Sequence, residues 1–241
     1  MNKTIALITA AGNGQRMNHT ENKLFLKIKG MSIIQRTVQT FLKINSIERL
    51  YLTVQSQELN KMQDELKNLD GSNKLRFVIG GQTRQESILN GLEKIALDFK
   101  EVTKSVKNEM ICLIHDGARP LIEKSTIQQC IEEIKTNHCG IGVAVPINDT
   151  IHMIDQNQNI INTPDRANLI AIQTPQGALF EQLLFAHRLA KANNFQATDD
   201  ISVLRYAEIP AKIYFGHINN IKITLPQDRL IAERILDTMN K

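Results

Sequence analysis

The stretch "ITAAGNGQRM", from Ile8 to Met17, leads from an apolar run into a loop that contains two glycines and an arginine. Glycines in such a loop let the backbone approach a ligand closely, and the loop amides can bind phosphate. Arg16 lies in this loop, and Lys23 follows seven residues later. One guanidinium and one ammonium group beside a turn of backbone amides suit a triphosphate. We therefore predict a nucleotide phosphate site here.

The two common phosphate loops do not match this stretch. A P-loop requires a lysine and then a serine or threonine directly after its last glycine, and neither follows Gly14. The dinucleotide-binding fingerprint requires a third glycine where this chain has Met17. It also requires an acidic residue after the second strand, where this chain has glutamine. A dehydrogenase is therefore disfavoured.

A second group of polar residues follows another apolar run, in "IHDGARP" at 114–120. Open α/β sheets bind ligands beyond the carboxyl ends of their strands, which makes Asp116 and Arg119 candidate site residues. The alternative is a structural Asp–Arg pair that braces the loop before Pro120. We expect His115 to be packed rather than catalytic. The chain offers no convincing Ser/His/Asp or paired-carboxylate signature.

The elements that must position these residues alternate between strand and helix patterns. Apolar, β-rich runs occur at 4–9, 49–54, 75–80, 110–116 and 140–146. Helical spacing of apolar residues occurs between them, at 34–42, 88–95 and 126–134, and Thr83 with Glu86 gives a capping-box signature. This alternation predicts an α/β fold, a single Rossmann-like domain over 1–241 with a mostly parallel, twisted sheet flanked by helices.

Residues 147–170 interrupt the alternation with a polar segment that is rich in Asn and Gln at its centre. We predict a protruding β-arm that turns at "DQNQN". Its apolar residues would be poorly covered within one chain, which suggests a homodimer; a surface insertion without a partner is the alternative. The segments expected after the arm are helices at 178–192 and 199–207, strands at 211–216 and 220–225, and a helix opening at Pro226.

Composition excludes several classes of protein. The 241 residues are 42% hydrophobic and 22% charged, which is ordinary for a globular protein of one large domain or two small ones. The net charge of +4 is spread without a basic block, and aromatic residues make up 5%, which argues against nucleic-acid binding. Three cysteines without C-x-x-C spacing indicate buried thiols in a reducing cytoplasm. No signal peptide or membrane span is expected.

Seven further motifs, in this order, resemble those of the 2-C-methyl-D-erythritol 4-phosphate cytidylyltransferase family, together with "AAGNGQRM…NKLF". They are "GGQTRQESILNGL" (80–92), "IHDGARPLI" (114–122), "AVPINDTI" (144–151), "TPDR" (163–166), "QTPQGALF" (173–180), "ATDDIS" (197–202) and "NIKITLPQD" (220–228). The resemblance covers nearly the whole chain. It implies transfer of CMP from CTP to 2-C-methyl-D-erythritol 4-phosphate, giving 4-diphosphocytidyl-2-C-methyl-D-erythritol and pyrophosphate in non-mevalonate isoprenoid synthesis.

The implied reaction needs no general base, because the attacking phosphate oxygen is already ionised at neutral pH. It needs charge neutralisation and in-line positioning of two anions that repel each other. The resemblance implies that Arg16, Lys23 and Lys222 are the catalytic cations, with Lys222 reaching the α-phosphate from the other side. The alternative for Lys222 is an edge-strand lysine that prevents aggregation.

The resemblance also implies the binding residues. Those expected to bind CTP are Ala10, Ala11, Gly12, Gly14, Gly81, Ser87 and Asp116, with Ser87 and backbone groups reading cytosine. Those expected to bind the acceptor are Asp116, Arg119, Arg166, Thr174 and Thr198, with Arg166 serving the neighbouring subunit's site. For Ser87 the alternative is an ordinary serine early in a helix.

No metal ligand is assigned to the protein. Asp199 and Asp200 resemble a metal pair, but their place at a helix start predicts capping instead. We expect Mg²⁺ held mainly by the CTP phosphates. Three positions depart from the family pattern: Asn22 replaces a usual proline and could loosen the loop, Gln82 replaces an acidic residue, and Gly117 replaces alanine.

Two other functions compete with this one. A ribitol 5-phosphate cytidylyltransferase would share the fold, the CTP site and the chemistry, and would differ only in the acceptor pocket. A non-catalytic nucleotide-binding regulator would keep the glycine loop but lose the cations on opposite sides of the phosphates. The presence of Arg16, Lys23 and Lys222 argues against the regulator.

Overall fold

A mixed sheet of seven strands forms the centre of the protein, seen here in a computed structural model that describes residues 3–12, 22–101 and 109–239. Its strand order is β11-β7-β10-β6-β1-β4-β5. The strands are β1 (Thr4–Thr9), β4 (Ile47–Val54), β5 (Leu75–Ile79), β6 (Ile111–Asp116), β7 (Gly140–Pro146), β10 (Ile170–Leu179) and β11 (Ala211–Phe215). All neighbours are parallel except β10, which is antiparallel to β6 and β7. The predicted mostly parallel α/β sheet is confirmed.

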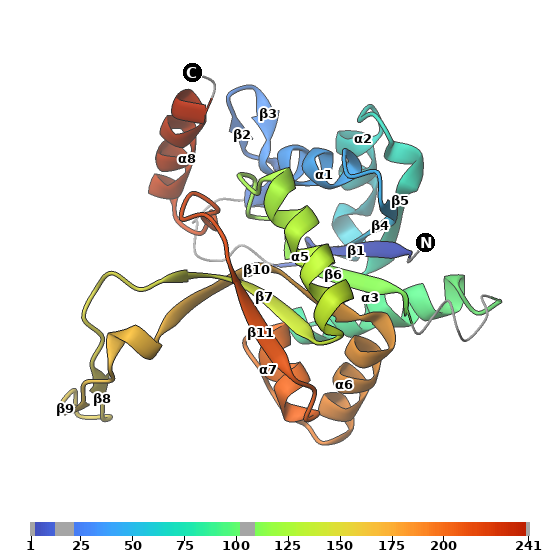
Figure 1. Cartoon of the computed structure of the whole chain (residues 1–241). Helices are drawn as coiled ribbons and strands as arrows, with labels where there is room; N and C mark the ends of the chain where they lie inside the picture. Colours follow the sequence, from blue (N-terminus) through green and yellow to red (C-terminus); the bar gives the residue numbers. More distant parts are fainter. Residues whose placement is uncertain (1–2, 13–21, 102–108, 240–241) are drawn as a thin grey trace.

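Helices cover both faces of this sheet, as Figure 1 shows. One face carries α1 (Ile33–Leu42), α2 (Leu59–Leu66), α5 (Lys124–Asn137) and α8 (Pro226–Met239), and the other carries α3 (Arg84–Asp98), α6 (Phe180–Ala192) and α7 (Asp200–Tyr206). Alternate residues of β1 enter the two cores: Ala6 and Ile8 pack on the first face, Ile5 and Leu7 on the second. Burial on both faces explains why the central strands are continuously apolar.

Several short elements complete the chain. They are the β-hairpin of β2 (Lys27–Ile28) and β3 (Met31–Ser32), and the single-turn helices η2 (Lys23–Phe25), η3 (Ser56–Glu58), η4 (Ser72–Lys74) and η5 (Arg166–Asn168). Two capping boxes fix helix starts: Ser32 with Gln35 at α1, and Thr83 with Glu86 at α3, the latter as predicted. In the part of the chain described, no helix is both long enough and apolar enough to cross a membrane.

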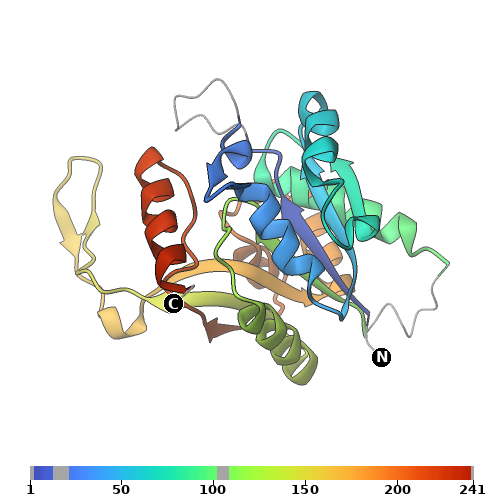
Figure 2. The same ribbon diagram turned by 90° about the horizontal axis from the view of Figure 1, so that it is seen from above.

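The segment at 147–170 forms the predicted arm. Its hairpin consists of β8 (Met153–Ile154) and β9 (Ile160–Asn162), and the Asp155 side chain holds the turn by accepting hydrogen bonds from the amides of Asn157 and Asn159. Figures 1 and 2 both show the arm projecting away from the sheet. Its apolar side chains are exposed, at 58% for Ile154 and 62% for Ile160.

Two expectations about elements differ from the structure. Residues 220–225 were expected to form a strand, but this prediction is wrong, because they run as a loop into α8. The Ile223 amide donates to Ala118 O at 2.8 Å, so the loop binds beside the end of β6 without joining the sheet. The helix expected over 178–192 begins at Phe180, because the two residues before it belong to β10, a strand that the sequence did not predict.

Candidate active site

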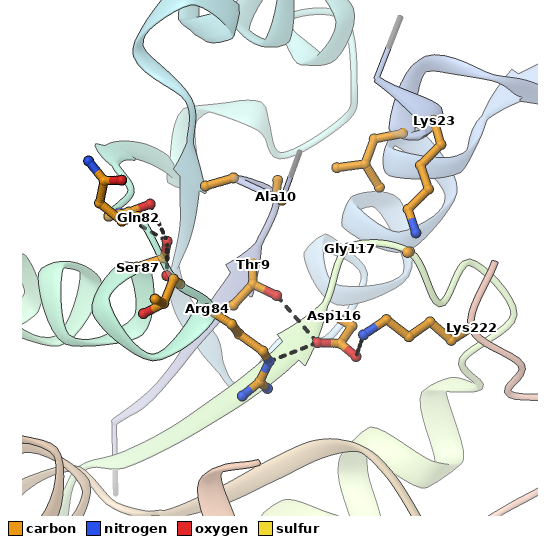
Figure 3. Close-up of a pocket in the computed structure, with 15 residues that line it drawn as sticks. Thr9, Ala10, Lys23, Gln82, Arg84, Ser87, Asp116, Gly117 and Lys222 are labelled. Atoms are coloured by element: carbon orange, nitrogen blue, oxygen red, sulfur yellow. Dashed lines mark hydrogen bonds and ion pairs between the residues drawn. The ribbon is translucent and has the colours of Figure 1, made fainter. Parts of the chain in front are cut away.

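A cavity of about 420 Å³ opens beyond the carboxyl ends of β1 and β6 (Figure 3). Fifteen described residues from five separate stretches line it: Thr9, Ala10, Ala11, Gly12, Lys23, Leu24, Gly81, Gln82, Thr83, Arg84, Ser87, Asp116, Gly117, Ala118 and Lys222. Parallel pairing of β1 with β6, in register from Thr4 to Thr9, places residues 10–12, which directly follow β1, beside the "HDG" turn. The sheet therefore brings the two chemistry-bearing stretches of the sequence to one edge.

Asp116 is the centre of the site's charged groups. Its Oδ2 lies 2.9 Å from Lys222 Nζ, and its Oδ1 accepts a hydrogen bond from Arg84 Nε at 3.2 Å. Thr9 Oγ1 donates to the same Oδ1 at 3.4 Å, and Arg119 Nε lies 3.7 Å from Oδ2. Figure 3 shows Arg84 and Lys222 approaching the carboxylate from opposite sides.

These cations decide the ionisation of Asp116. Burial alone raises the pKa of this carboxyl, but the nearby charges of Arg84 and Lys222 outweigh burial and hold the pKa well below its usual range. Asp116 is the only carboxylate among the described residues that line the cavity. The described lining residues therefore carry one negative charge among Lys23, Arg84 and Lys222, and this excess of positive charge suits an anionic ligand.

A backbone corner occupies the side of the cavity formed by the start of α3. The Gly81 amide donates to Ser87 Oγ at 3.0 Å, and Ser87 Oγ donates to Thr83 O at 2.8 Å. A Cβ at Gly81 would lie 2.4 Å from Glu86 Cβ, so only glycine fits here. The Gln82 amide is held by the Glu86 carboxylate at 2.7 Å, which makes the side chain at position 82 unimportant for the loop's shape.

The opposite wall carries Lys23, and Asn22 fixes the turn that presents it. The Asn22 side chain accepts from the Leu24 amide at 3.0 Å and donates to Glu58 at 2.7 Å. These bonds restrain the turn at Asn22, where the family pattern has a proline, while the loop before it lies outside the described residues. Lys23 Nζ donates to Ile223 O at 2.8 Å, which links the wall to the loop that carries Lys222.

Several predicted residues lie outside the cavity. Thr174 is buried beneath Asp116, where its hydroxyl accepts from the Asp116 amide at 3.1 Å and contacts His115 Nδ1 at 3.0 Å. Arg119 donates to Asn220 O at 2.8 Å behind the same turn. Arg166 lies on the arm and donates to Asn148 O at 2.8 Å.

The remaining predicted residues do not meet the cavity either, or cannot be placed. Thr198 is exposed in the segment before α7. Asp199 caps α7 by accepting from the Ser202 amide, as predicted. His115 is fully buried against Phe41, also as predicted. Gly14 and Arg16 lie outside the described residues.

Sequence reasoning missed Arg84 and Thr9, which both contact Asp116. Arg84 is the first residue of α3, where a charged residue is usually solvated, and its second carboxylate partner, Asp200, lies 116 residues away. Thr9 ends β1 and could have been noticed as the last residue of a strand that points at the cavity. Among the described residues, no group of three or more His, Cys, Asp or Glu is arranged to hold a metal ion.

A positively charged cavity with a backbone corner, at the carboxyl edge of an α/β sheet, is the arrangement of a nucleotidyltransferase. A comparison with known protein families identifies one: the model of the family described as 2-C-methyl-D-erythritol 4-phosphate cytidylyltransferase matches residues 4–238. Relatives of that name are 35% identical in Alkaliphilus oremlandii, over 99% of this chain and 97% of the relative, and 37% identical in Bacillus licheniformis, over 96% and 94%.

Solved structures agree with this match. The 4-diphosphocytidyl-2C-methyl-D-erythritol synthase of Anaerococcus prevotii has a TM-score of 0.81 and 26% identity, covering 98% of this chain and 96% of that one. The Francisella tularensis 2-C-methyl-D-erythritol 4-phosphate cytidylyltransferase has a TM-score of 0.78 and 25% identity, covering 97% and 99%. The chain belongs to the 2-C-methyl-D-erythritol 4-phosphate cytidylyltransferase family. It is an enzyme of CTP-dependent 4-diphosphocytidyl-2-C-methyl-D-erythritol synthesis.

Proposed function

We propose that the cavity binds CTP and performs the transfer by direct in-line attack. A phosphate oxygen of 2-C-methyl-D-erythritol 4-phosphate forms a bond to the α-phosphorus of CTP, the bond from that phosphorus to the bridging oxygen breaks, and pyrophosphate leaves with the electron pair. No proton has to be removed from the nucleophile. The observation that carries this proposal is that Lys23 and Lys222 line the same cavity as the backbone turn at Gly81.

The polar groups of the cavity are assigned to the base of CTP, and its cationic groups to the phosphates. In this proposal the backbone of Ala10, Ala11 and Gly81 and the Ser87 hydroxyl face cytosine, whose amine and carbonyl need one acceptor and one donor. Uracil would leave such buried groups unpaired, which disfavours its binding. Lys23 and Lys222 neutralise the phosphates, and their charge is most useful when five-coordinate phosphorus carries the greatest negative charge. Arg16 is assigned the same task.

Asp116 keeps Lys222 in place before the nucleotide arrives. Their 2.9 Å ion pair orients the ammonium at the cavity wall, and the carboxylate's remaining capacity can accept hydrogen bonds from ribose or acceptor hydroxyls. The described residues of the cavity provide one carboxylate, already shared between cations, so we propose that Mg²⁺ is held mainly by the CTP phosphates. When bound, the ion would add positive charge at the phosphates.

The acceptor site and the dimer are part of the same proposal. Arg166 and Thr198 do not line the cavity of their own chain, whereas the arm that carries Arg166 exposes apolar residues. We infer a homodimer through the arm in which Arg166 serves the partner's acceptor phosphate. Thr174 and Arg119 support the Asp116 turn from below and behind. Three buried, unpaired cysteines favour a reducing compartment, which we propose is the cytoplasm.

Pyrophosphate release from the purified protein tests this function. The protein receives Mg²⁺ and CTP with either methylerythritol 4-phosphate or ribitol 5-phosphate, and Lys23→Ala is assayed alongside. Release with the first acceptor, lost in the variant, is expected. Release with ribitol 5-phosphate alone would overturn the acceptor but keep the CTP site, and CTP binding without release in either case would favour the regulator.

A further inference from the structure

A line of alternating charges runs from the cavity into the core between α3, α6 and α7. Arg84 spans two carboxylates: its Nε donates to Asp116 Oδ1 at 3.2 Å, and its Nη2 donates to Asp200 Oδ2 at 2.8 Å. Asp200 Oδ1 in turn lies 3.3 Å from His187 Nε2. The proposed reaction uses only the cavity end of this line, which leaves its buried end without a role.

Asp200 is a buried carboxylate at a fixed helix start. Its side chain is 1% exposed, as is that of His187. It is the first residue of α7, and the Gln176 side chain of β10 accepts hydrogen bonds from the amides of Asp200 and Ile201 at 2.8 and 3.0 Å. Burial alone raises the pKa of Asp200, but the charge of Arg84 outweighs it and lowers the pKa, so the carboxylate is ionised.

The Arg84 side chain, by contrast, lies partly at the surface, so its rotamer must be fixed by its neighbours. Its side chain is 28% exposed at the cavity wall, and its Nη1 makes no hydrogen bond or ion pair with any residue that the structure describes. An arginine side chain has many rotamers, and only the two-carboxylate geometry turns Nε toward Asp116. A buried anion at fixed position behind the guanidinium selects that geometry.

We propose that Asp200 is a positioning residue for cytidylyl transfer: it holds Arg84 so that Arg84 fixes the Asp116 carboxylate, which in turn orients Lys222. The inference rests on the proposed function of the cavity. It goes beyond capping, the role predicted for the Asp199–Asp200 pair, because Asp199 alone supplies the cap. Asp200 does not touch the cavity and acts through Arg84.

The test compares Asp200→Asn with Asp98→Asn in the full-length protein. Asp98 is the control, since it too forms an ion pair with a cationic residue of α3, Lys94 at 2.7 Å, but at the far end of that helix. We expect kcat/KM to fall at least tenfold in Asp200→Asn and to stay within twofold in Asp98→Asn. Combining Asp200→Asn with Arg84→Lys should lower kcat/KM by no more than twofold beyond Arg84→Lys alone, because both changes break one unit.

A spectroscopic readout separates positioning from stability. The Nε–Hε resonance of Arg84, assigned by its loss in Arg84→Lys, should shift in Asp200→Asn and stay in place in Asp98→Asn. Unchanged activity in Asp200→Asn, losses that multiply in the double variant, or an unmoved resonance would each overturn the proposal. If Asp200→Asn does not fold, Asp200→Glu keeps the charge but displaces the carboxylate, and the same shift and loss are expected of it.

This design keeps the two proposals apart. If the wild type releases no pyrophosphate with either acceptor, the proposed function fails, while the Arg84 resonance still decides whether Asp200 positions this arginine. If the wild type is active, but the Arg84 resonance does not move in Asp200→Asn and the losses multiply in the double variant, the proposed function of the cavity stands. The positioning role of Asp200 is then rejected.

Discussion

Asp116 shows how one residue can organise a site without reacting. Four side chains converge on its carboxylate, and its backbone amide is tied to Thr174 from below. The nearby cations hold the pKa of this carboxyl well below its usual range, so it is ionised at neutral pH. The pH dependence of the reaction should therefore come from the substrates' phosphates and not from Asp116.

The first prediction concerns Lys222. Removing its ammonium in Lys222→Ala should lower kcat about 100-fold or more, since a preorganised charge at a developing anion contributes at least this much. Steady-state pyrophosphate release measures the loss. Lys27→Ala is the control, because Lys27 is exposed on β2 and should retain activity within about twofold. Equal activity of the two variants would assign Lys222 to solubility rather than to catalysis.

The second prediction concerns His115, whose pKa is lowered to about 3 by burial. The folded state holds it neutral, whereas the unfolded chain protonates it near pH 6.5. Its contribution to stability is therefore complete above pH 6.5 and falls as the pH drops toward 3. Between pH 7.5 and 5 the wild type should lose about 2 kcal/mol more unfolding free energy than His115→Gln. Urea unfolding at the two pH values measures this, and equal losses would contradict it.

At the scale of elements, the start of α3 serves both stability and the site. Its capping box holds the same turn that carries Gly81 and Gln82 on the cavity wall. The start of α1 has an equivalent box, formed by Ser32 and Gln35, whose residues do not line the cavity. The two helices therefore offer a matched comparison.

The third prediction uses this pair. Thr83→Ala and Ser32→Ala should each lower the unfolding free energy by about 1 kcal/mol, the usual cost of losing a cap. Only Thr83→Ala should also weaken CTP binding, measured by calorimetry, because only its turn faces the cavity. Equal CTP affinities in the two variants would show that the α3 turn does not contact the nucleotide.

The elements also show what could be predicted from the sequence. The apolar runs of β1, β6 and β7 are continuous because helices cover both faces, and such runs are easily recognised. β10 was missed because its centre contains Pro175, Gly177 and glutamines, which break the strand pattern. The loop at 220–225 has the alternating apolar and polar pattern of a strand, because Ile223 is buried while Lys222 and Thr224 remain partly exposed.

Within the site, local motifs predicted the cavity residues that share a stretch, such as Gly81 with Ser87. The Arg84–Asp200 pair could not be predicted, because nothing near either residue indicates that α3 and α7 meet. Arg119 and Thr174 were recognised as part of the site, but the sequence does not reveal that one lies behind the turn and the other beneath it. Whether a residue lines a cavity or lies behind its wall depends on tertiary packing, which a sequence motif does not describe.

At the scale of the whole molecule, the arm projects from the sheet and exposes apolar side chains. Its large exposed apolar side chains are Ile151, Met153, Ile154, Ile160, Ile161 and Ile170. Such a patch on an extended arm typically marks an interaction surface.

The fourth prediction is that Ile160→Lys converts the proposed dimer to a monomer in sedimentation experiments, because a charge buried in an apolar interface is costly. Phe185→Lys is the control: Phe185 is similarly exposed, at 57%, but lies on α6, away from the arm. A wild type that is monomeric at micromolar concentration would reject the dimer. A dimer that survives Ile160→Lys would place its interface elsewhere.

The position of β10 in the sheet has a consequence for how the protein is made. β7 pairs with β10 and β11, and both of these strands follow it in the chain. During synthesis, β7 is therefore an apolar segment without neighbours until residue 179 has emerged, and it gains its second neighbour only with residue 215. β1, β4, β5 and β6 can assemble much earlier. In the nascent chain β7 therefore lacks both neighbours for roughly a seventh of translation, and it keeps one open edge for about as long again, an interval in which unpaired strand edges favour aggregation.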